Sequence, residues 1–225
     1  DDISLPLPPM RRPDLRQTML EIVLEMLAEH GVTDVELIIA TSFHRRMEAF
    51  EIRHAVGDKV FKAYFPTKLY CHDGEAVDGM VELGRTELGE AVRMNRRAAE
   101  SDLLIYVNIN LVPMDGGAKS IAIGLCDYAA LQAHHTPQAI RESNSYFDPT
   151  NSALASSAER QAAVVKQHLN CFHIETVVNN QMFDPLMPFF TKNEDEWNLL
   201  DRTAFGVSKF ALSKMPRQAK RNLLF

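Results

Sequence analysis

Apolar residues recur at intervals of three and four between residues 13 and 30. The stripe consists of Leu15, Met19, Ile22 and Met26. This spacing predicts an amphipathic helix, and Gly31 is a good terminator because glycine readily adopts the conformation that ends a helix. An apolar, β-branched run over residues 35–43 follows and predicts a strand.

The same order of helix then strand repeats along the chain. The pattern predicts helices over residues 46–56 and 87–100, and strands over residues 60–70 and 103–109. Nearly continuous apolar strands that alternate with helices are typical of a parallel sheet buried on both faces. We therefore predict an α/β fold with an open, Rossmann-like, largely parallel sheet and helices on both faces.

The pattern is less regular after residue 137. A stripe over residues 158–169 predicts another helix, and residues 172–178 predict one more strand. Beyond Pro188, Asn193 and Glu196 have the spacing of a capping box ahead of a helical stripe that begins at Trp197.

Composition excludes several classes of function. Lys and Arg number 24 against 30 Asp and Glu, so a net charge of −6 offers no basic field for nucleic acid. The three cysteines have no metal-type spacing, which favours reduced thiols. No apolar run reaches the roughly 18 residues of a membrane span, and the start does not resemble a signal peptide. We expect a cytoplasmic protein, cut at both ends from a longer chain.

Candidate chemistry lies where predicted strands end. In parallel sheets the binding crevice lies at the carboxyl ends of the strands. Residues 42–44 (Ser-Phe-His), 71–73 (Cys-His-Asp) and 108–110 (Asn-Ile-Asn) occupy these positions. Side chains that bind or react are expected among them.

The segment from Asp115 to Ser120 reads Asp-Gly-Gly-Ala-Lys-Ser. Two glycines ahead of Lys119 allow the backbone to approach a bound group, since glycine has no Cβ. Ala118 stands between Gly117 and Lys119, so the segment is not a P-loop and does not predict ATP binding. By itself the segment predicts only a tight turn with a surface lysine.

Several segments together resemble the lactate racemase family, in the order found there. They are Asp-Ile-Ser-Leu-Pro at 2–6, Thr-Ser-Phe-His-Arg at 41–45, Val-Arg-Met-Asn at 92–95 ahead of Ala-Glu-Ser-Asp-Leu at 99–103, Gly-Gly-Ala-Lys at 116–119, and a histidine sixteen residues after that lysine. The resemblance covers residues 2–137, and the step from Lys119 to His135 is its most specific part.

The resemblance implies a nickel-pincer nucleotide as the cofactor, covalently attached through Lys119. It assigns nickel ligation to His135, and imidazole is a suitable ligand for nickel. His134 is the competing ligand, because adjacent histidines usually point in different directions. Gly116 and Gly117 would contact the cofactor, and the Asp2 carboxylate would hold a ribose hydroxyl or orient a histidine.

The implied reaction is racemisation or epimerisation of a small 2-hydroxy acid, by hydride abstraction and return through a 2-oxo acid. His44 matches the first catalytic histidine, and its pKa range suits an acid and base at neutral pH. Without the lysine segment, His44 would be an ordinary loop histidine. The resemblance also divides the chain into an α/β domain over residues 1–190 and a helical segment over 191–225, which leads towards a C-terminal domain that completes the substrate pocket.

The sequence departs from the family at two places. Leu5 stands where the family has an arginine for the substrate carboxylate, and a hydrocarbon cannot replace that bidentate contact. No histidine lies between residues 108 and 114, where the family has a second one, and Asn110 cannot act as a base. Arg11 or Arg12 and His72 are candidate replacements, with surface charge and turn capping as their ordinary alternatives.

Three functions follow from these residues. The first is a racemase or epimerase for a 2-hydroxy acid other than lactate, and the second is a non-catalytic or regulatory homologue that binds the cofactor or a hydroxy acid. The third is a zinc or manganese hydrolase, with His44, His72, Asp73 and His135 as ligands. A paired motif such as H-E-x-x-H is missing, which ranks the hydrolase last.

Overall fold

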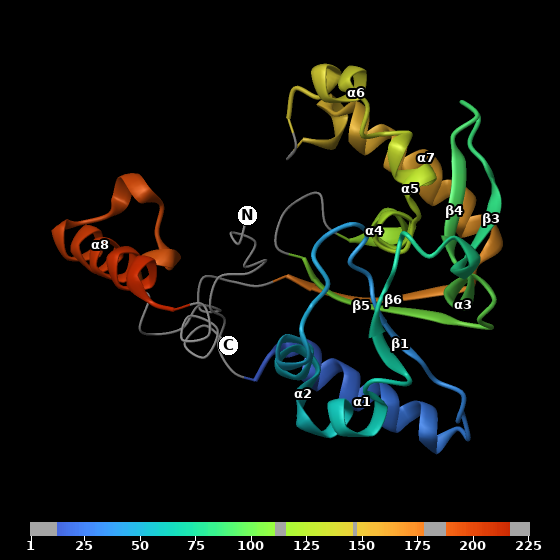
Figure 1. Ribbon diagram of the computed structural model, residues 1–225, viewed down its shortest axis with the longest axis horizontal. Coiled ribbons are helices and arrows are strands. Elements are labelled where there is room, and N and C mark those ends of the chain that lie inside the picture. The colour runs from blue at the N-terminus through green and yellow to red at the C-terminus, as the bar shows by residue number, and fades with distance from the viewer. Residues whose placement is uncertain (1–12, 111–115, 146–147, 178–187, 217–225) are drawn as a thin grey trace.

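A computed structural model describes residues 13–110, 116–145, 148–177 and 188–216 of the chain (Figure 1). The strands are β1 (Leu37–Ile39), β2 (Leu69–Cys71), β3 (Met80–Arg85), β4 (Ala91–Asn95), β5 (Leu104–Asn110) and β6 (Cys171–Val177). The helices are α1 (Leu15–Glu29), α2 (Ala49–Tyr64), α3 (Arg96–Ala99), α4 (Gly117–Gly124), α5 (Tyr128–Gln132), α6 (Pro137–Glu142), α7 (Ala153–His168) and α8 (Leu199–Lys214). Short 3₁₀ helices are η1 (Val77–Gly79), η2 (Pro149–Asn151), η3 (Pro188–Thr191) and η4 (Glu194–Glu196).

The described strands pair two by two. β1 lies parallel to β2, β5 lies parallel to β6, and β3 is antiparallel to β4. The β5–β6 pair is in register from Leu104 opposite Cys171 to Asn110 opposite Val177. The predicted α/β class and its parallel pairing are confirmed. The sheets are smaller than the single open sheet that the apolar runs suggested.

Helices cover β5 and β6 on both sides. In Figure 1, α1 and α2 lie on one side of these strands, and α4, α5 and α7 lie on the other. Two apolar clusters match this division. One joins β4, α4 and α7 around Met94, Ile121 and Val165, and the other centres on α2 with Ile52 and Val60. The helices on both faces follow from the strands being apolar on both sides.

Residues 87–100 were predicted as a helix, and the prediction is wrong for most of them. They form the turn and second strand of the β3–β4 hairpin, and only Arg96–Ala99 are helical. Burial alternates along β4, where Val92 and Met94 are buried and their neighbours are partly exposed. Asn95 ends the strand and caps α3, because its side chain accepts a hydrogen bond from the Ala98 amide.

The strand predicted over residues 60–70 is also wrong for most of its length. α2 continues to Tyr64, and only Leu69–Cys71 form a strand. Gly57, with φ 79°, kinks α2 into two helical stretches, and Val60 on the second stretch packs into the same buried cluster as Ile52 and Val56 on the first. The helix begins at a capping box between Glu48 and Glu51, three residues later than predicted.

The remaining predicted elements are confirmed, although the strand predicted over residues 35–43 is limited to Leu37–Ile39. The helix and strand predicted near residues 158–178 are α7 and β6. The Asn193–Glu196 capping box is present on η4, while α8 begins at a second box between Asn198 and Asp201. α8 stands apart from the strands in Figure 1. Among the described residues, no helix is both long and apolar enough to cross a membrane.

Candidate functional site

A cleft of about 1240 Å³ lies beside β1 and β5. Its walls come from these two strands, from α1, α2, α4 and α7, and from the loop that follows β1. Most of its lining is aliphatic, with Lys119 and His44 among the polar residues. The two side chains with the predicted attachment and acid–base roles therefore line the same cleft.

Lys119 lies in the first turn of α4, two residues after Gly117. Its side chain is partly buried, and no ion pair or hydrogen bond joins it to another described residue. Gly116 and Gly117 have φ angles of 90° and 69°, which few other residues adopt. The predicted glycine turn is therefore the N-terminus of a helix, and it directs the lysine into the cleft.

His44 lies in a turn after β1. Ser42 has a positive φ of 48°, and its amide donates to the Gly124 carbonyl at 2.8 Å, while the His44 amide donates to Thr41 at 2.8 Å. The hydrogen bond from Ser42 ties this turn to the end of α4, the helix that carries Lys119. The His44 side chain is exposed and forms no hydrogen bond with a described residue, so it is available to a ligand in the cleft.

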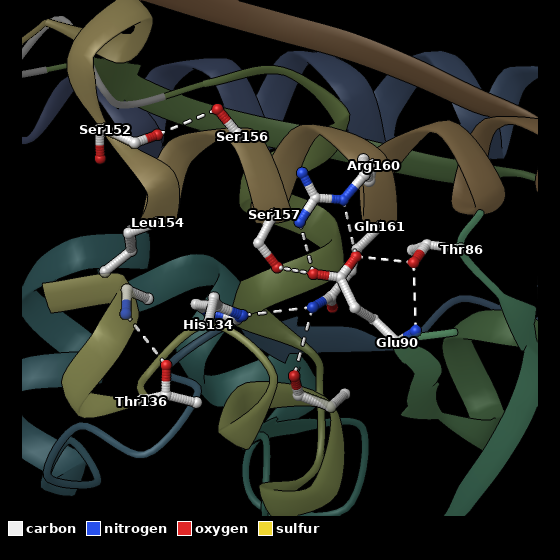
Figure 2. Close-up of polar contacts among 12 residues, drawn as sticks. Thr86, Glu90, His134, Thr136, Ser152, Leu154, Ser156, Ser157, Arg160 and Gln161 are labelled. Atoms are coloured by element: carbon white, nitrogen blue, oxygen red, sulfur yellow. Dashed lines mark hydrogen bonds and ion pairs between the residues drawn. The ribbon is translucent and has the colours of Figure 1, made fainter. Parts of the chain in front are cut away.

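The adjacent histidines differ in their surroundings. His134 is fully buried, and the Gln161 amide donates to its Nδ1 at 3.2 Å (Figure 2). Its Nε2 is buried and has no partner among the described residues. Burial, and secondly the charge of His135, lower the pKa of His134 to about 4. His135 is exposed, with its ring 4.7 Å from that of His134, and neither ring lines the cleft.

A carboxylate that sequence reasoning did not single out lies at the start of α4. Glu175, on β6, accepts hydrogen bonds from the Asn110 side chain at 2.8 Å and from the Gly117 amide at 2.9 Å. Asn110 accepts in turn from Asn108 at 3.0 Å. His173 and Glu175 are two positions apart on a predicted strand, so their side chains project from the same face of the sheet. This alternation of polar residues was the sequence signal that could have identified Glu175.

His72 does not take the place of the missing histidine. It is 1% exposed, its Nε2 lies 2.8 Å from the Cys126 carbonyl, and its Nδ1 lies 3.4 Å from the Asn95 amide nitrogen. Burial lowers its pKa. Because both ring nitrogens are used and the ring does not line the cleft, His72 has a structural role.

The other predicted residues fall into two groups. Asp2, Leu5, Arg11 and Arg12 lie outside the described residues. Asp73 forms an ion pair with Arg46. Within the described part of the chain, no group of three or more His, Cys, Asp or Glu side chains is placed to hold a metal ion. The ligand set proposed for a hydrolase, which included Asp73, is therefore not assembled.

Comparison with known proteins decides the family. A family model described as the lactate racemase N-terminal domain matches residues 1–147. This chain belongs to that family. The lactate racemase of Thermoanaerobacterium thermosaccharolyticum is 25% identical over 130 residues, which are 56% of this chain and 30% of that protein. The lactate racemase of Lactiplantibacillus plantarum is 26% identical over 110 residues, which are 47% of this chain and 25% of that protein.

Solved structures support the same fold. The lactate racemase apoprotein from T. thermosaccharolyticum superimposes with a TM-score of 0.62 at 21% identity, covering 76% of this chain and 41% of that chain. A protein from Thermotoga maritima gives a TM-score of 0.59 at 16% identity, covering 74% of this chain and 44% of that chain. The chain thus spans less than a third of the length of the two lactate racemases matched by sequence and less than half of each solved structure.

Proposed function

We propose that this chain is the cofactor-bearing part of a 2-hydroxyacid racemase or epimerase, with a nickel-pincer nucleotide attached to Lys119. The observation that carries the proposal is the placement of Lys119 and His44 in one cleft, both without partners among the described residues. Family membership supports it, because the matched relatives are named lactate racemases.

The residues present fit the attachment of such a group. Lys119 offers an amine that is not engaged in an ion pair with a described residue, and the cleft of about 1240 Å³ has room for a nucleotide. Gly117 has no Cβ, and the space that a Cβ would occupy there is open, which leaves room for a bound group at the start of α4; at Gly116 the corresponding space is filled by the Glu175 carboxylate. His135 is exposed and would be the nickel ligand; because its ring does not line the cleft, the bound group would have to extend beyond the cleft to reach it. His134 is too buried to reach a bound metal without rearrangement.

When bound, the cofactor would supply a hydride acceptor and donor. The chain's own contribution is the proton: His44 would take the hydroxyl proton of the substrate as the C2 hydrogen leaves, and would return it after the hydride is added to the other face. The largely aliphatic walls of the cleft would limit the access of water to a bound 2-oxo acid.

The substrate differs from lactate in this proposal. Leu5 removes the arginine that the family uses for the carboxylate, and Asn110 and its neighbours supply no second base. A C-terminal domain of the complete protein would provide the missing carboxylate contact, and residues 191–225 would lead to it. The domain division at residue 190, the contact with Asp2 and the cytoplasmic location stay predictions.

The test is the intact mass and nickel content of the complete protein, coexpressed with the enzymes that synthesise the cofactor. Wild type should carry a nucleotide-sized adduct and nickel, and Lys119→Ala should lack both. Lys166→Ala is the matched control, because Lys166 is an exposed lysine on α7. A wild type without adduct, next to a lactate racemase that loads normally, would contradict the proposal.

A specific observation favours a second candidate, a homologue that binds without turnover. Asn110 occupies the end of β5 and is hydrogen-bonded to Glu175, so an amide, which cannot act as a base, stands where the family has its second histidine. Exchange of the C2 hydrogen of 2-hydroxy acids by the cofactor-loaded protein separates the two. Exchange with any of them establishes an enzyme, and its absence with all of them favours the binding homologue.

A further inference from the structure

Glu175 holds the start of the lysine-bearing helix from a neighbouring strand. One carboxylate oxygen accepts from the Gly117 amide at 2.9 Å and lies 3.1 Å from Nδ1 of His173, and the other accepts from Asn110 at 2.8 Å. Gly117 is the first residue of α4. The carboxylate therefore pairs one of the amides that a helix leaves free at its N-terminus, where a negative charge is also favourable.

The local chain conformation is built around this carboxylate. A Cβ added to Gly116 would lie 2.2 Å from Oε2 of Glu175 and 2.7 Å from the Asn110 amide nitrogen. A Cβ added to Gly117 would meet no atom within 4 Å. Both glycines have positive φ, so they share a backbone requirement, but only Gly116 is also required for the approach of Glu175.

The polar surroundings keep Glu175 ionised. Burial acts to raise its pKa, but the hydrogen bonds from Asn110, Gly117 and His173 outweigh it and lower the pKa below the ordinary value. No other described side chain accepts a hydrogen bond from the Gly117 amide. Two consecutive glycines begin the helix, and glycine is a poor helix former, so the carboxylate is needed to hold this turn.

We propose that Glu175 is a positioning residue for Lys119: it fixes the first turn of α4 and thereby the direction in which the lysine amine enters the cleft. The inference rests on the proposed function, since it concerns the lysine that would bear the cofactor. Lys119 is the third residue of α4, so it lies in the turn that would fray if the Gly117 amide lost its acceptor.

The experiment measures the rate at which an acetylating reagent modifies Lys119 in the complete, cofactor-free protein, with Lys166 as the internal reference. Peptide mass spectrometry gives the ratio of the two rates at a temperature well below the melting point of each variant. Loss of a helix cap typically increases the open population about fivefold, so Glu175→Ala, which removes the acceptor of the Gly117 amide, should raise the Lys119 to Lys166 ratio about fivefold. The Gly116→Ala variant should raise it similarly, because its new Cβ displaces the carboxylate.

Gly117→Ala is the matched control. It has the same unfavourable φ but leaves Glu175 in place, so its ratio should rise less than that of Gly116→Ala. A wild-type ratio in Glu175→Ala overturns the proposal, as does an equal rise in the two glycine variants. If Glu175→Ala does not fold, Gly116→Ala against Gly117→Ala still decides, since a merely structural glycine requirement would affect both alike.

The two proposals fail separately. Acetylation is measured without cofactor, so its result holds whether or not a nucleotide is ever attached to Lys119. An altered acetylation ratio together with a wild type that forms no adduct supports the positioning role and contradicts the proposed function. Normal adduct formation with an unchanged ratio in Glu175→Ala does the reverse.

Discussion

Glu90 is expected to contribute a large, pH-dependent part of the stability of this chain. It follows the β3–β4 turn, and its carboxylate accepts from Ser157 at 2.6 Å, from Thr86 at 2.6 Å and from Arg160 at 2.6 and 2.9 Å (Figure 2). The side chain is 11% exposed. The contacts join the hairpin to α7 across 67 to 70 positions of sequence.

The magnitude follows from the pKa of this carboxyl group. Burial acts to raise it, but the hydrogen bonds from Arg160, Ser157 and Thr86 and the charge of Arg160 lower the pKa of Glu90 from 4.5 to about 2. That difference corresponds to about 3 kcal/mol of unfolding free energy at neutral pH. Because the folded pKa is the lower one, the unfolded chain binds the proton first. The contribution is complete above pH 4.5 and disappears as the pH falls towards 2.

Urea unfolding of Glu90→Gln tests this directly. The variant should lose about 2 to 3 kcal/mol at pH 7, and the difference from wild type should shrink to about 1 kcal/mol at pH 3. Glu87→Gln, at an exposed glutamate of the same turn, is the control and should change stability by less than about 0.5 kcal/mol. Equal effects of the two substitutions, or a Glu90 difference that is constant between pH 7 and pH 3, would refute the reasoning.

Three further substitutions test how packing, helix propensity and a buried hydrogen bond set the stability of the chain. Gly124→Ala would place a Cβ 2.8 Å from that of Ala40, at the contact between α4 and the end of β1, and should lower the unfolding free energy by about 1 to 3 kcal/mol. Gly206→Ala in α8 meets no atom within 4 Å and should raise the unfolding free energy by up to about 1 kcal/mol. Denaturant titration of both variants measures this, and a neutral Gly124→Ala would show that the contact yields easily. His72→Leu should cost about 1 to 3 kcal/mol, because the Cys126 carbonyl loses its buried partner; a thermal melt as stable as wild type would mean that water replaces the ring.

The elements that the sequence determined are those whose apolar spacing has a single interpretation. The apolar run of β5 and the stripe of α7 were each long enough to distinguish a buried strand from a helix. The stripe predicted for α1 identified the helix but not its packed face, because Leu15, Ile22 and Met26 are exposed. The lysine segment could also be interpreted from the sequence, because glycines beside a lysine allow backbone conformations and close approaches that other residues do not. These local signals, joined to the spacing between Lys119 and His135, were sufficient to indicate the family.

Errors arose where short segments depend on partners far along the chain. Residues 87–95 contain residues compatible with either a helix or a strand, and they become a hairpin because Val92 and Met94 pack against α4 and α7. Residues 60–64 remain helical because Val60 completes the face that α2 packs into its cluster. Propensity is a weak prior in such segments, and tertiary burial decides between the two conformations.

The composition of the site was likewise divided between sequence and tertiary structure. The sequence alone indicated Lys119 and His44 as candidate site residues, since each lies in a short segment that resembles the lactate racemase family. Only the fold could show that they share one cleft, that His134 is buried while His135 is exposed, and that Glu175 on β6 holds the start of α4. The physical reason is that burial and hydrogen bonding join residues 58 positions apart, and spacing along the chain carries no information about such contacts.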